Sequence, residues 1–123
     1  MPVIPPVPNR DDQYFWDGVA EGRLLLQRCA DCNVLRHPPQ PMCAACGSLA
    51  VEAVDASGKG TIFTWLLTDD RVATIVELEE GIRMVSNLVE VEPDQVRIGM
   101  PVELVIAELD GVVLPQFRPV GVA

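Results

Sequence analysis

The sequence predicts a small, mainly β protein with a compact cysteine-rich unit on its N-terminal side, and three observations support this prediction. The chain has 123 residues, which suits one domain or one domain with a small satellite. Four cysteines occur as two Cys-x-x-Cys pairs before residue 50. From about residue 50 onward, apolar and β-branched runs alternate with turn residues. We therefore expect a small β-barrel preceded by a separate cysteine-rich unit.

The N-terminal segment is predicted to be an extended arm followed by a helix. Residues 1–8 contain four prolines, which favour extended backbone without regular hydrogen bonds. A helix is expected to begin at Asn9, whose side chain can accept hydrogen bonds from the first backbone amides. Phe15 and Val19 then lie on one face, and Gly22 ends the helix.

The next segment predicts two short strands around the first cysteine pair. Leucines and polar residues over 24–28 form the first strand, and 34–36 form its return, before the prolines after His37 interrupt any pairing. We assign residues 9–49 to the helix and this cysteine-rich unit, and residues 50–123 to the barrel.

The C-terminal half has the strand spacing of a five-stranded OB-like barrel. Glu79-Glu80-Gly81 fits a hairpin turn, and residues 92–99 fit one helical turn inserted before the last two strands. Five or so strands are too few for a sandwich and suit a small, partly open barrel. The predicted strand runs are 50–56, 60–68, 72–79, 82–91, 101–109 and 112–117.

The two cysteine pairs predict one tetrahedral metal site. In each pair, two intervening residues allow a tight turn to direct both sulfurs at one ion, and Asn33 or Gly47 follows where left-handed backbone is easiest. Zinc is the expected structural ion, with iron in a rubredoxin-like site as the alternative. A thioredoxin-type redox pair is the other alternative, although a redox pair normally opens a helix. The predicted ligands are Cys29, Cys32, Cys43 and Cys46.

Composition disfavours nucleic acid as a partner and a membrane as the location of the chain. Eighteen Asp and Glu against nine Lys and Arg give a net charge of −9, so nucleic acid, which is held by basic side chains, is a disfavoured partner. No stretch reaches the roughly 20 apolar residues that span a bilayer, and the N-terminus lacks the basic region of a secretion signal, so we expect a cytoplasmic protein without a membrane segment.

The sequence offers no catalytic constellation, and we assign no catalytic residue. Metal binding consumes all four thiols, and the single histidine, His37, is better explained by a structural role. The paired carboxylates Asp69-Asp70 and Glu79-Glu80 fall at predicted turn tips, where solvated charge is the usual explanation. These features predict an accessory module.

The order of several motifs adds a resemblance to a known family. The motifs are Phe15-Trp16-Asp17-Gly18, both cysteine pairs, residues 57–65, residues 97–102 and residues 115–119. The chain resembles the OB-fold family with an N-terminal rubredoxin-like zinc ribbon, long a domain of unknown function, which accompanies thiolase-like enzymes in acyl-CoA metabolism. Steroid side-chain aldolases and archaeal hydroxymethylglutaryl-CoA synthesis are settings of this family. The resemblance implies that this chain is a subunit bound to a thiolase-like enzyme and that it meets an acyl-CoA ester through the complex.

Three functional hypotheses follow. The first is a non-catalytic subunit of a thiolase-superfamily enzyme (thiolase or aldol lyase) in steroid or lipid side-chain degradation, which stabilises its partner and assists the CoA-ester site. The second is a nucleic-acid-binding OB-fold using Phe63, Trp65 and Phe117, and the third is an independent CoA-ester carrier. Expected partner contacts are Phe15, Trp16, Arg36 and His37, and expected CoA phosphate contacts are Lys59, Arg83 and Arg118.

Overall fold

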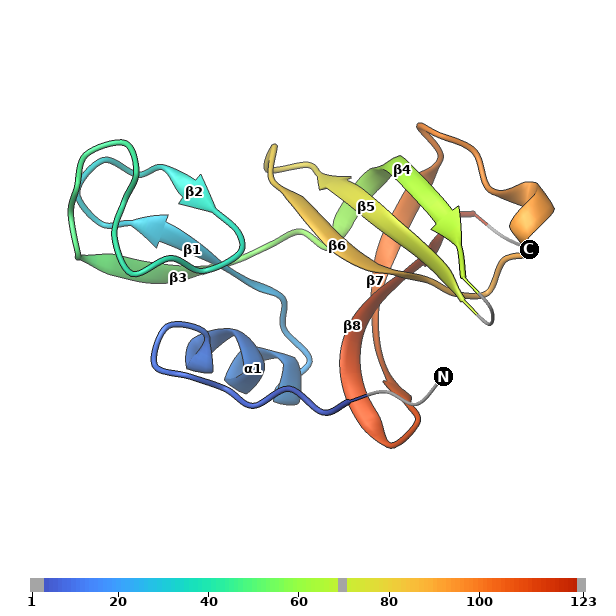
Figure 1. Cartoon of the computed structure of the whole chain (residues 1–123). Helices are drawn as coiled ribbons and strands as arrows, with labels where there is room; N and C mark the ends of the chain where they lie inside the picture. Colours follow the sequence, from blue (N-terminus) through green and yellow to red (C-terminus); the bar gives the residue numbers. More distant parts are fainter. Residues whose placement is uncertain (1–3, 69–70, 122–123) are drawn as a thin grey trace.

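The computed structural model describes residues 4–68 and 71–121, and it shows an N-terminal helix with a three-stranded sheet beside a closed five-stranded barrel (Figure 1). Part of the predicted arm and the Asp69-Asp70 tip lie outside the described residues. The mainly β class and the five-stranded barrel are confirmed. The elements are α1 (Gln13–Ala20), β1 (Leu25–Cys29), β2 (Leu35–Arg36), β3 (Val51–Asp55), β4 (Lys59–Leu67), β5 (Val72–Leu78), β6 (Arg83–Leu88), η1 (Pro93–Gln95), β7 (Pro101–Leu109) and β8 (Val112–Pro119).

Helix α1 begins later than predicted. The Asn9 Oδ1 accepts hydrogen bonds from the backbone amides of Asp11 and Asp12 at 2.8 and 3.1 Å, as a capping side chain does. These bonds stabilise a turn over residues 9–12, and the regular helix starts only at Gln13. Phe15 and Val19 are buried on one face as expected, and Gly22, with φ of 79°, follows the helix.

Strand β3 belongs to the N-terminal sheet, whereas the sequence placed this run with the barrel. The sheet order is β2-β1-β3, so β1 is central and pairs with β3 from Leu25↔Asp55 to Cys29↔Val51. Strand β2 is only two residues long and cannot satisfy the backbone groups of both edges of β1. Strand β3 supplies the missing partners along the other edge.

The barrel closes in the order β4-β5-β6-β8-β7, although a partly open barrel was expected. Closure comes from the β4–β7 pairing and from a short parallel contact between β6 and β8 at Leu88↔Phe117. Strand β5 alternates strictly, and its inward residues are all buried. Side chains from several strands fill the interior, among them the fully buried Ile62, Val76, Val102 and Phe117.

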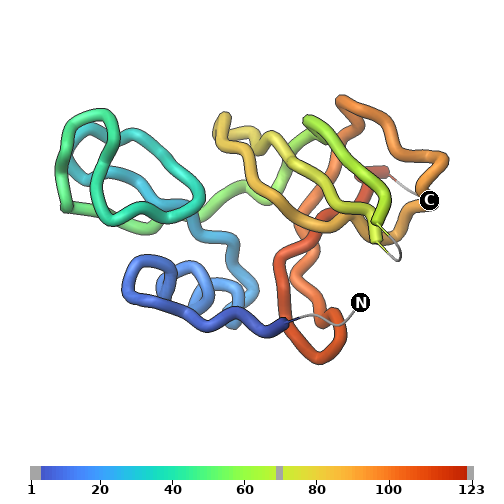
Figure 2. The backbone as a smooth tube through the Cα atoms, in the orientation of Figure 1, coloured from blue at the N-terminus to red at the C-terminus, as the bar shows by residue number. Residues whose placement is uncertain are grey.

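The helix and the barrel share one hydrophobic core. Phe15 and Val19 of α1 belong to the same buried cluster as Phe117 of β8 and Met84 of β6. The chain rises from the helix into the N-terminal sheet and then crosses to the barrel after β3 (Figure 2). The shared core fixes the loop after β2 close to the barrel, which positions the cleft described below.

Candidate metal centre and adjoining cleft

The two cysteine pairs adopt the same turn. The backbone amide of Asn33 donates to the Cys29 carbonyl at 2.9 Å, and that of Gly47 donates to the Cys43 carbonyl at 2.8 Å. Asn33 and Gly47 have φ of 65° and 76°, the left-handed conformation that asparagine and glycine adopt more readily than other residues. The predicted pair of equivalent turns is thereby confirmed.

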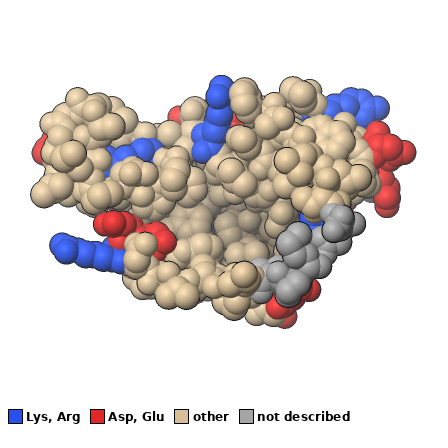
Figure 3. All heavy atoms as spheres, viewed as in Figure 1, with Lys and Arg blue, Asp and Glu red and all other residues tan. Residues whose placement is uncertain are grey.

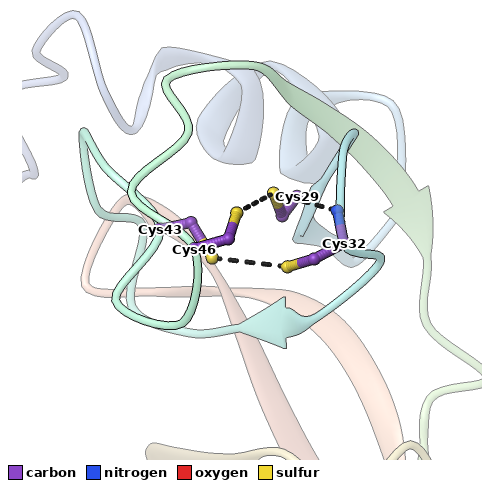
Figure 4. Close-up of side chains that lie close together, drawn as sticks. All are labelled: Cys29, Cys32, Cys43 and Cys46. Carbon is purple, nitrogen blue, oxygen red and sulfur yellow. Dashed lines mark hydrogen bonds between the residues drawn. The ribbon is translucent and has the colours of Figure 1, made fainter.

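The four sulfurs of Cys29, Cys32, Cys43 and Cys46 converge on one point (Figure 4). All four Sγ atoms lie within 4.8 Å of one another. The Cys29–Cys46 and Cys32–Cys43 sulfurs are each 3.6 Å apart, close to the edge of about 3.8 Å in a tetrahedron with metal–sulfur bonds of about 2.3 Å. The donor set therefore fits a tetrahedral metal ion.

The electrostatics of the cluster also favour a bound cation. A hydrogen bond from the Cys32 backbone amide is the largest effect on Cys29 and lowers its pKa to about 6. The Ser48 backbone amide acts in the same direction on Cys46, but the sulfurs of Cys29 and Cys32 raise the Cys46 pKa to about 12. Without a cation, neighbouring thiolates oppose one another's charge. A divalent ion would remove this repulsion, and four thiolates leave no coordination position open for water or substrate.

A cleft of about 440 Å³ separates this cysteine-rich unit from the barrel. One wall is formed by α1 and the loop after β2, and the other by β5, β6 and β8. Uncharged atoms surround most of the hollow in the middle of the molecule in Figure 3. The lining is Asp12, Phe15, Trp16, His37, Pro38, Pro39, Ala73, Met84, Val85, Ser86, Asn87, Leu114 and Pro115.

Three of the four expected partner contacts line this cleft. Phe15 is only 5% exposed, so it belongs to the core and reaches the cleft as its floor. Trp16 is partly buried and meets the Phe15 ring edge-on at 5.0 Å. The ring centroids of His37 and Phe15 are 5.2 Å apart, and burial lowers the pKa of His37. Among the described residues, the His37 Nδ1 has no hydrogen-bond partner.

The fourth expected contact, Arg36, takes part in a polar cluster that sequence reasoning missed. Its Nε donates to Gln27 Oε1, and the Gln40 backbone amide donates to the same oxygen at 2.9 Å. Gln27 is only 3% exposed, so this amide ties β1 to the proline-rich loop from inside. The one signal in the sequence was a glutamine directly after the leucines of this strand.

The three residues expected to contact CoA phosphates do not form one cluster. Lys59 of β4 and Arg118 of β8 are the cross-strand neighbours of Glu103 on β7. Arg83 of β6 is instead the cross-strand neighbour of Glu77 on β5. Arg118 is 3.2 Å from Glu103 and 3.5 Å from Glu90, and hydrogen bonds to these carboxylates raise its pKa. Both arginines already have carboxylate partners, which a phosphate would have to displace.

The aromatic side chains of the barrel do not provide a base-stacking surface. Phe117 is fully buried, and Trp65 packs against the core. The Arg83 guanidinium covers the Phe63 ring at 3.7 Å. Stacking of nucleic-acid bases needs exposed aromatic faces along a basic groove, which these three residues do not supply.

Comparison with known proteins assigns the chain to a family. The protein-family model for the ChsH2 rubredoxin-like zinc ribbon domain matches residues 16–52. The family model for the ChsH2 C-terminal OB-fold domain matches residues 53–107. A DUF35 domain-containing scaffold protein of Pyrococcus furiosus is 32% identical over 130 residues, covering 92% of this chain and 95% of the relative. The chain belongs to the ChsH2/DUF35 family. The family resemblance noted in the sequence is therefore confirmed, and the four cysteines lie in its zinc ribbon.

Two further relatives are larger than this chain. A probable enoyl-CoA hydratase alpha subunit of Thermomonospora curvata is 41% identical over 93% of this chain. A 3-oxo-4,17-pregnadiene-20-carboxyl-CoA hydratase alpha subunit of Mycobacterium tuberculosis is 42% identical over 81% of it. This chain spans only 39% and 35% of their respective lengths.

Solved structures show the same architecture. A chain of the Ltp2-ChsH2(DUF35) aldolase superposes with a TM-score of 0.86 at 40% identity, covering 93% of this chain and 98% of that one. A DUF35 protein of unknown function from Sulfolobus solfataricus, at 12% identity and a TM-score of 0.65, shares the fold over 90% of this chain and 86% of its own. Among the described residues, no helix has the length and apolar character needed to cross a bilayer.

Proposed function

We propose that this chain is a non-catalytic accessory subunit of a thiolase-like enzyme that acts on an acyl-CoA ester, with an aldol lyase as the favoured partner. The observation that carries the proposal is the likeness, at 40% identity and nearly full coverage of both chains, to a chain of the Ltp2-ChsH2(DUF35) aldolase. A chain that matches one component of such an assembly over its whole length is expected to assemble in the same manner.

The metal centre supports an accessory role. We assign zinc to the four cysteines because a closed shell of four thiolates is typical of structural zinc sites. The ion would hold the two turns together and take no part in chemistry. Its folding contribution is large, because a site of this kind does not exist in the unfolded chain.

The surroundings of His37 support the absence of catalysis by this subunit alone. A histidine base is usually oriented by a carboxylate or carbonyl that accepts from its other ring nitrogen. The His37 Nδ1 has no such partner in the described part of the chain, and burial lowers the pKa of His37, which favours the neutral imidazole. His37 is better suited to packing against Phe15 than to proton transfer.

The names of the larger relatives suggest the class of substrate. Both relatives are hydratase subunits, one named for enoyl-CoA and the other for a steroid carboxyl-CoA. A partner acting on a steroid or lipid side-chain CoA ester is consistent with these names. The accessory subunit would stabilise that partner and help to shape its CoA-ester site, and Lys59, Arg83 or Arg118 would reach a phosphate only by exchanging a glutamate partner.

Co-purification tests this proposal. The tagged chain should be co-expressed, one at a time, with each thiolase-like protein of its own genome and isolated by affinity and size-exclusion chromatography. We expect one of these proteins to co-elute in a fixed ratio and to be less soluble when expressed alone. If none co-elutes with zinc-loaded, folded chain, the accessory-subunit proposal is wrong.

A further inference from the structure

The outer face of the β4–β5–β6 sheet is apolar over much of its area. Strand register places Thr64, Ile75 and Val85 in one cross-strand row. Leu66 and Ala73 lie in the next row with Asn87, on the same face because side chains alternate with a period of two. The opposite face of β5 is buried in the barrel. This outer face is therefore not needed for the core.

Large apolar side chains on this face are open to solvent. Val85 is 75% exposed, Leu66 is 59% exposed and Phe63 is 42% exposed. Val85 and Ala73 also line the cleft beneath α1, so the sheet face and the cleft form one continuous surface. The docking face is defined here by Phe63, Leu66, Ile75 and Val85, with Trp16 and Pro38 as a wall along one side.

The docking face carries almost no net charge, although the chain has a net charge of −9. Arg83 pairs with Glu77 at 3.1 Å in the cross-strand row beside Phe63 and thereby cancels the one carboxylate in that row. The guanidinium also lies over Phe63, which covers part of its polar surface. An exposed apolar area without net charge is typical of a protein interaction surface.

We propose that the docking face, including the cleft, receives an apolar segment of the thiolase-like partner. This inference rests on the proposed function and adds the location of the contact. A second copy of the chain is a poorer occupant, because it would bring together two molecules that each carry a charge of −9. Trp16 at the cleft wall and Val85 at its edge are the expected anchors, since partly buried aromatic residues beside an apolar patch contribute most to such interfaces.

A free acyl group is also a poorer occupant than a protein segment. Small-molecule sites bury roughly 70–90% of the ligand surface. The cleft continues onto the outer face of the sheet, where Val85 and Leu66 have most of their surface in water. An acyl chain lying there would remain largely hydrated, whereas a protein surface could cover the whole area.

Two substitutions and a matched control test the inference. Val85→Glu places a charge in the centre of the docking face, and Leu66→Glu does the same on the neighbouring strand. Ile98→Glu is the control, because this substitution makes the same change in charge at an exposed site outside the docking face. Ile98 is 71% exposed and lies near η1. All variants are first checked for zinc content and circular dichroism, and their affinity for the purified partner is then measured by titration.

We expect Val85→Glu and Leu66→Glu to raise the Kd at least about tenfold, which corresponds to about 1.4 kcal/mol, while Ile98→Glu leaves it unchanged. If the wild-type complex forms and both folded variants bind as tightly as Ile98→Glu, the inference is overturned and the accessory role stands. It is equally overturned if Val85→Glu separates a dimer of this chain, or weakens acyl-CoA binding, without affecting the partner. Failure of the wild-type chain to bind any thiolase-like protein overturns the proposed function and this inference together.

Discussion

Tyr14 and Arg36 each bury a polar atom that lacks a hydrogen-bond partner in the described part of the chain. These atoms are the Tyr14 hydroxyl oxygen and the Arg36 Nη1. A buried hydroxyl without a partner costs roughly 1–3 kcal/mol of desolvation. Burial also raises the pKa of Tyr14 to about 12, with the nearby charge of Arg36 acting weakly in the opposite direction.

Tyr14→Phe is therefore expected to leave the protein as stable as before or to stabilise it by about 1 kcal/mol, because the substitution removes a desolvated group and keeps the ring. Urea unfolding of the zinc-loaded protein measures this. A loss of more than about 1 kcal/mol would show that the hydroxyl makes a hydrogen bond that contributes to stability.

The ionisation of Tyr14 gives a second check, since it is the only tyrosine in the chain. The folded protein should titrate near pH 12, and the urea-unfolded protein near the ordinary pKa of 10.0. Because the folded pKa is the higher one, ionisation of Tyr14 favours the unfolded state, so its titration leaves the stability unchanged below pH 10 and lowers it as the pH rises through about 12. Ultraviolet absorbance of tyrosinate follows both transitions, and coincident midpoints would contradict the buried position.

Cys43→Ser tests the metal centre at the residue scale. A serine hydroxyl does not ionise as a thiol does, so the variant should lose most of its zinc and the order of the N-terminal sheet. The neighbouring Met42→Ser is the control, because Met42 is 53% exposed and holds no ligand atom of the cluster. Metal analysis and circular dichroism give the readout. Equimolar zinc and an unchanged spectrum in Cys43→Ser would refute the ligand assignment.

The sequence predicted the four-cysteine cluster better than the contacts around the cleft. Ligand spacing and the turn residues Asn33 and Gly47 are local properties, so the pattern alone sufficed. The polar cluster around Gln27 depends on how β1 packs against the proline-rich loop. It does not follow from sequence spacing, because it results from contacts between separate segments.

At the scale of elements, two paired barrel strands, β4 and β5, approach each other unusually closely at Gly60. A Cβ added at Gly60 in β4 would lie 2.4 Å from the Glu77 carbonyl oxygen of β5 and 2.9 Å from a Val76 methyl carbon. The Glu77 oxygen belongs to the backbone of a paired strand and cannot move aside as a flexible side chain would. The absence of a side chain at Gly60 is therefore a condition of this pairing.

Gly60→Ala should destabilise the protein by about 3 kcal/mol, at the upper end of the usual cost of overpacking. Gly81→Ala is the matched control, because Gly81 has φ of 85° but nothing within 4 Å, so only the backbone strain of about 1 kcal/mol applies. Urea unfolding followed by tryptophan fluorescence compares the two. Equal losses for both variants would show that β4 and β5 are not as close as the structure places them.

The positions of most strands could be predicted because the turn residues between them are distinctive. The hairpin at Glu79-Glu80-Gly81 lies between β5 and β6 as expected. Pairing partners were less predictable. The run over β3 has the same composition as a barrel strand, and its assignment to the N-terminal sheet depends on the unpaired edge of β1. The predicted helix start was also wrong, because Asn9 stabilises a turn that precedes the regular helix, which begins at Gln13.

At the scale of the whole molecule, charge and surface point to a protein partner. The net charge of −9 opposes binding to nucleic acid, and the arginines that could meet phosphate are paired with glutamates. The exposed apolar residues of the docking face need a partner surface to leave water. Together with the four converging cysteines, these properties agree with the proposed role of an accessory subunit.

The most direct test of this account is acyl-CoA turnover by the purified proteins. The zinc-loaded chain, its thiolase-like partner and the mixture of the two should be assayed with the same CoA esters at the same concentrations. We predict no turnover by the chain alone, little by the partner alone, and activity that rises with added chain until a fixed ratio is reached. Turnover by the chain alone, or a partner whose activity is the same with and without it, would contradict the accessory role.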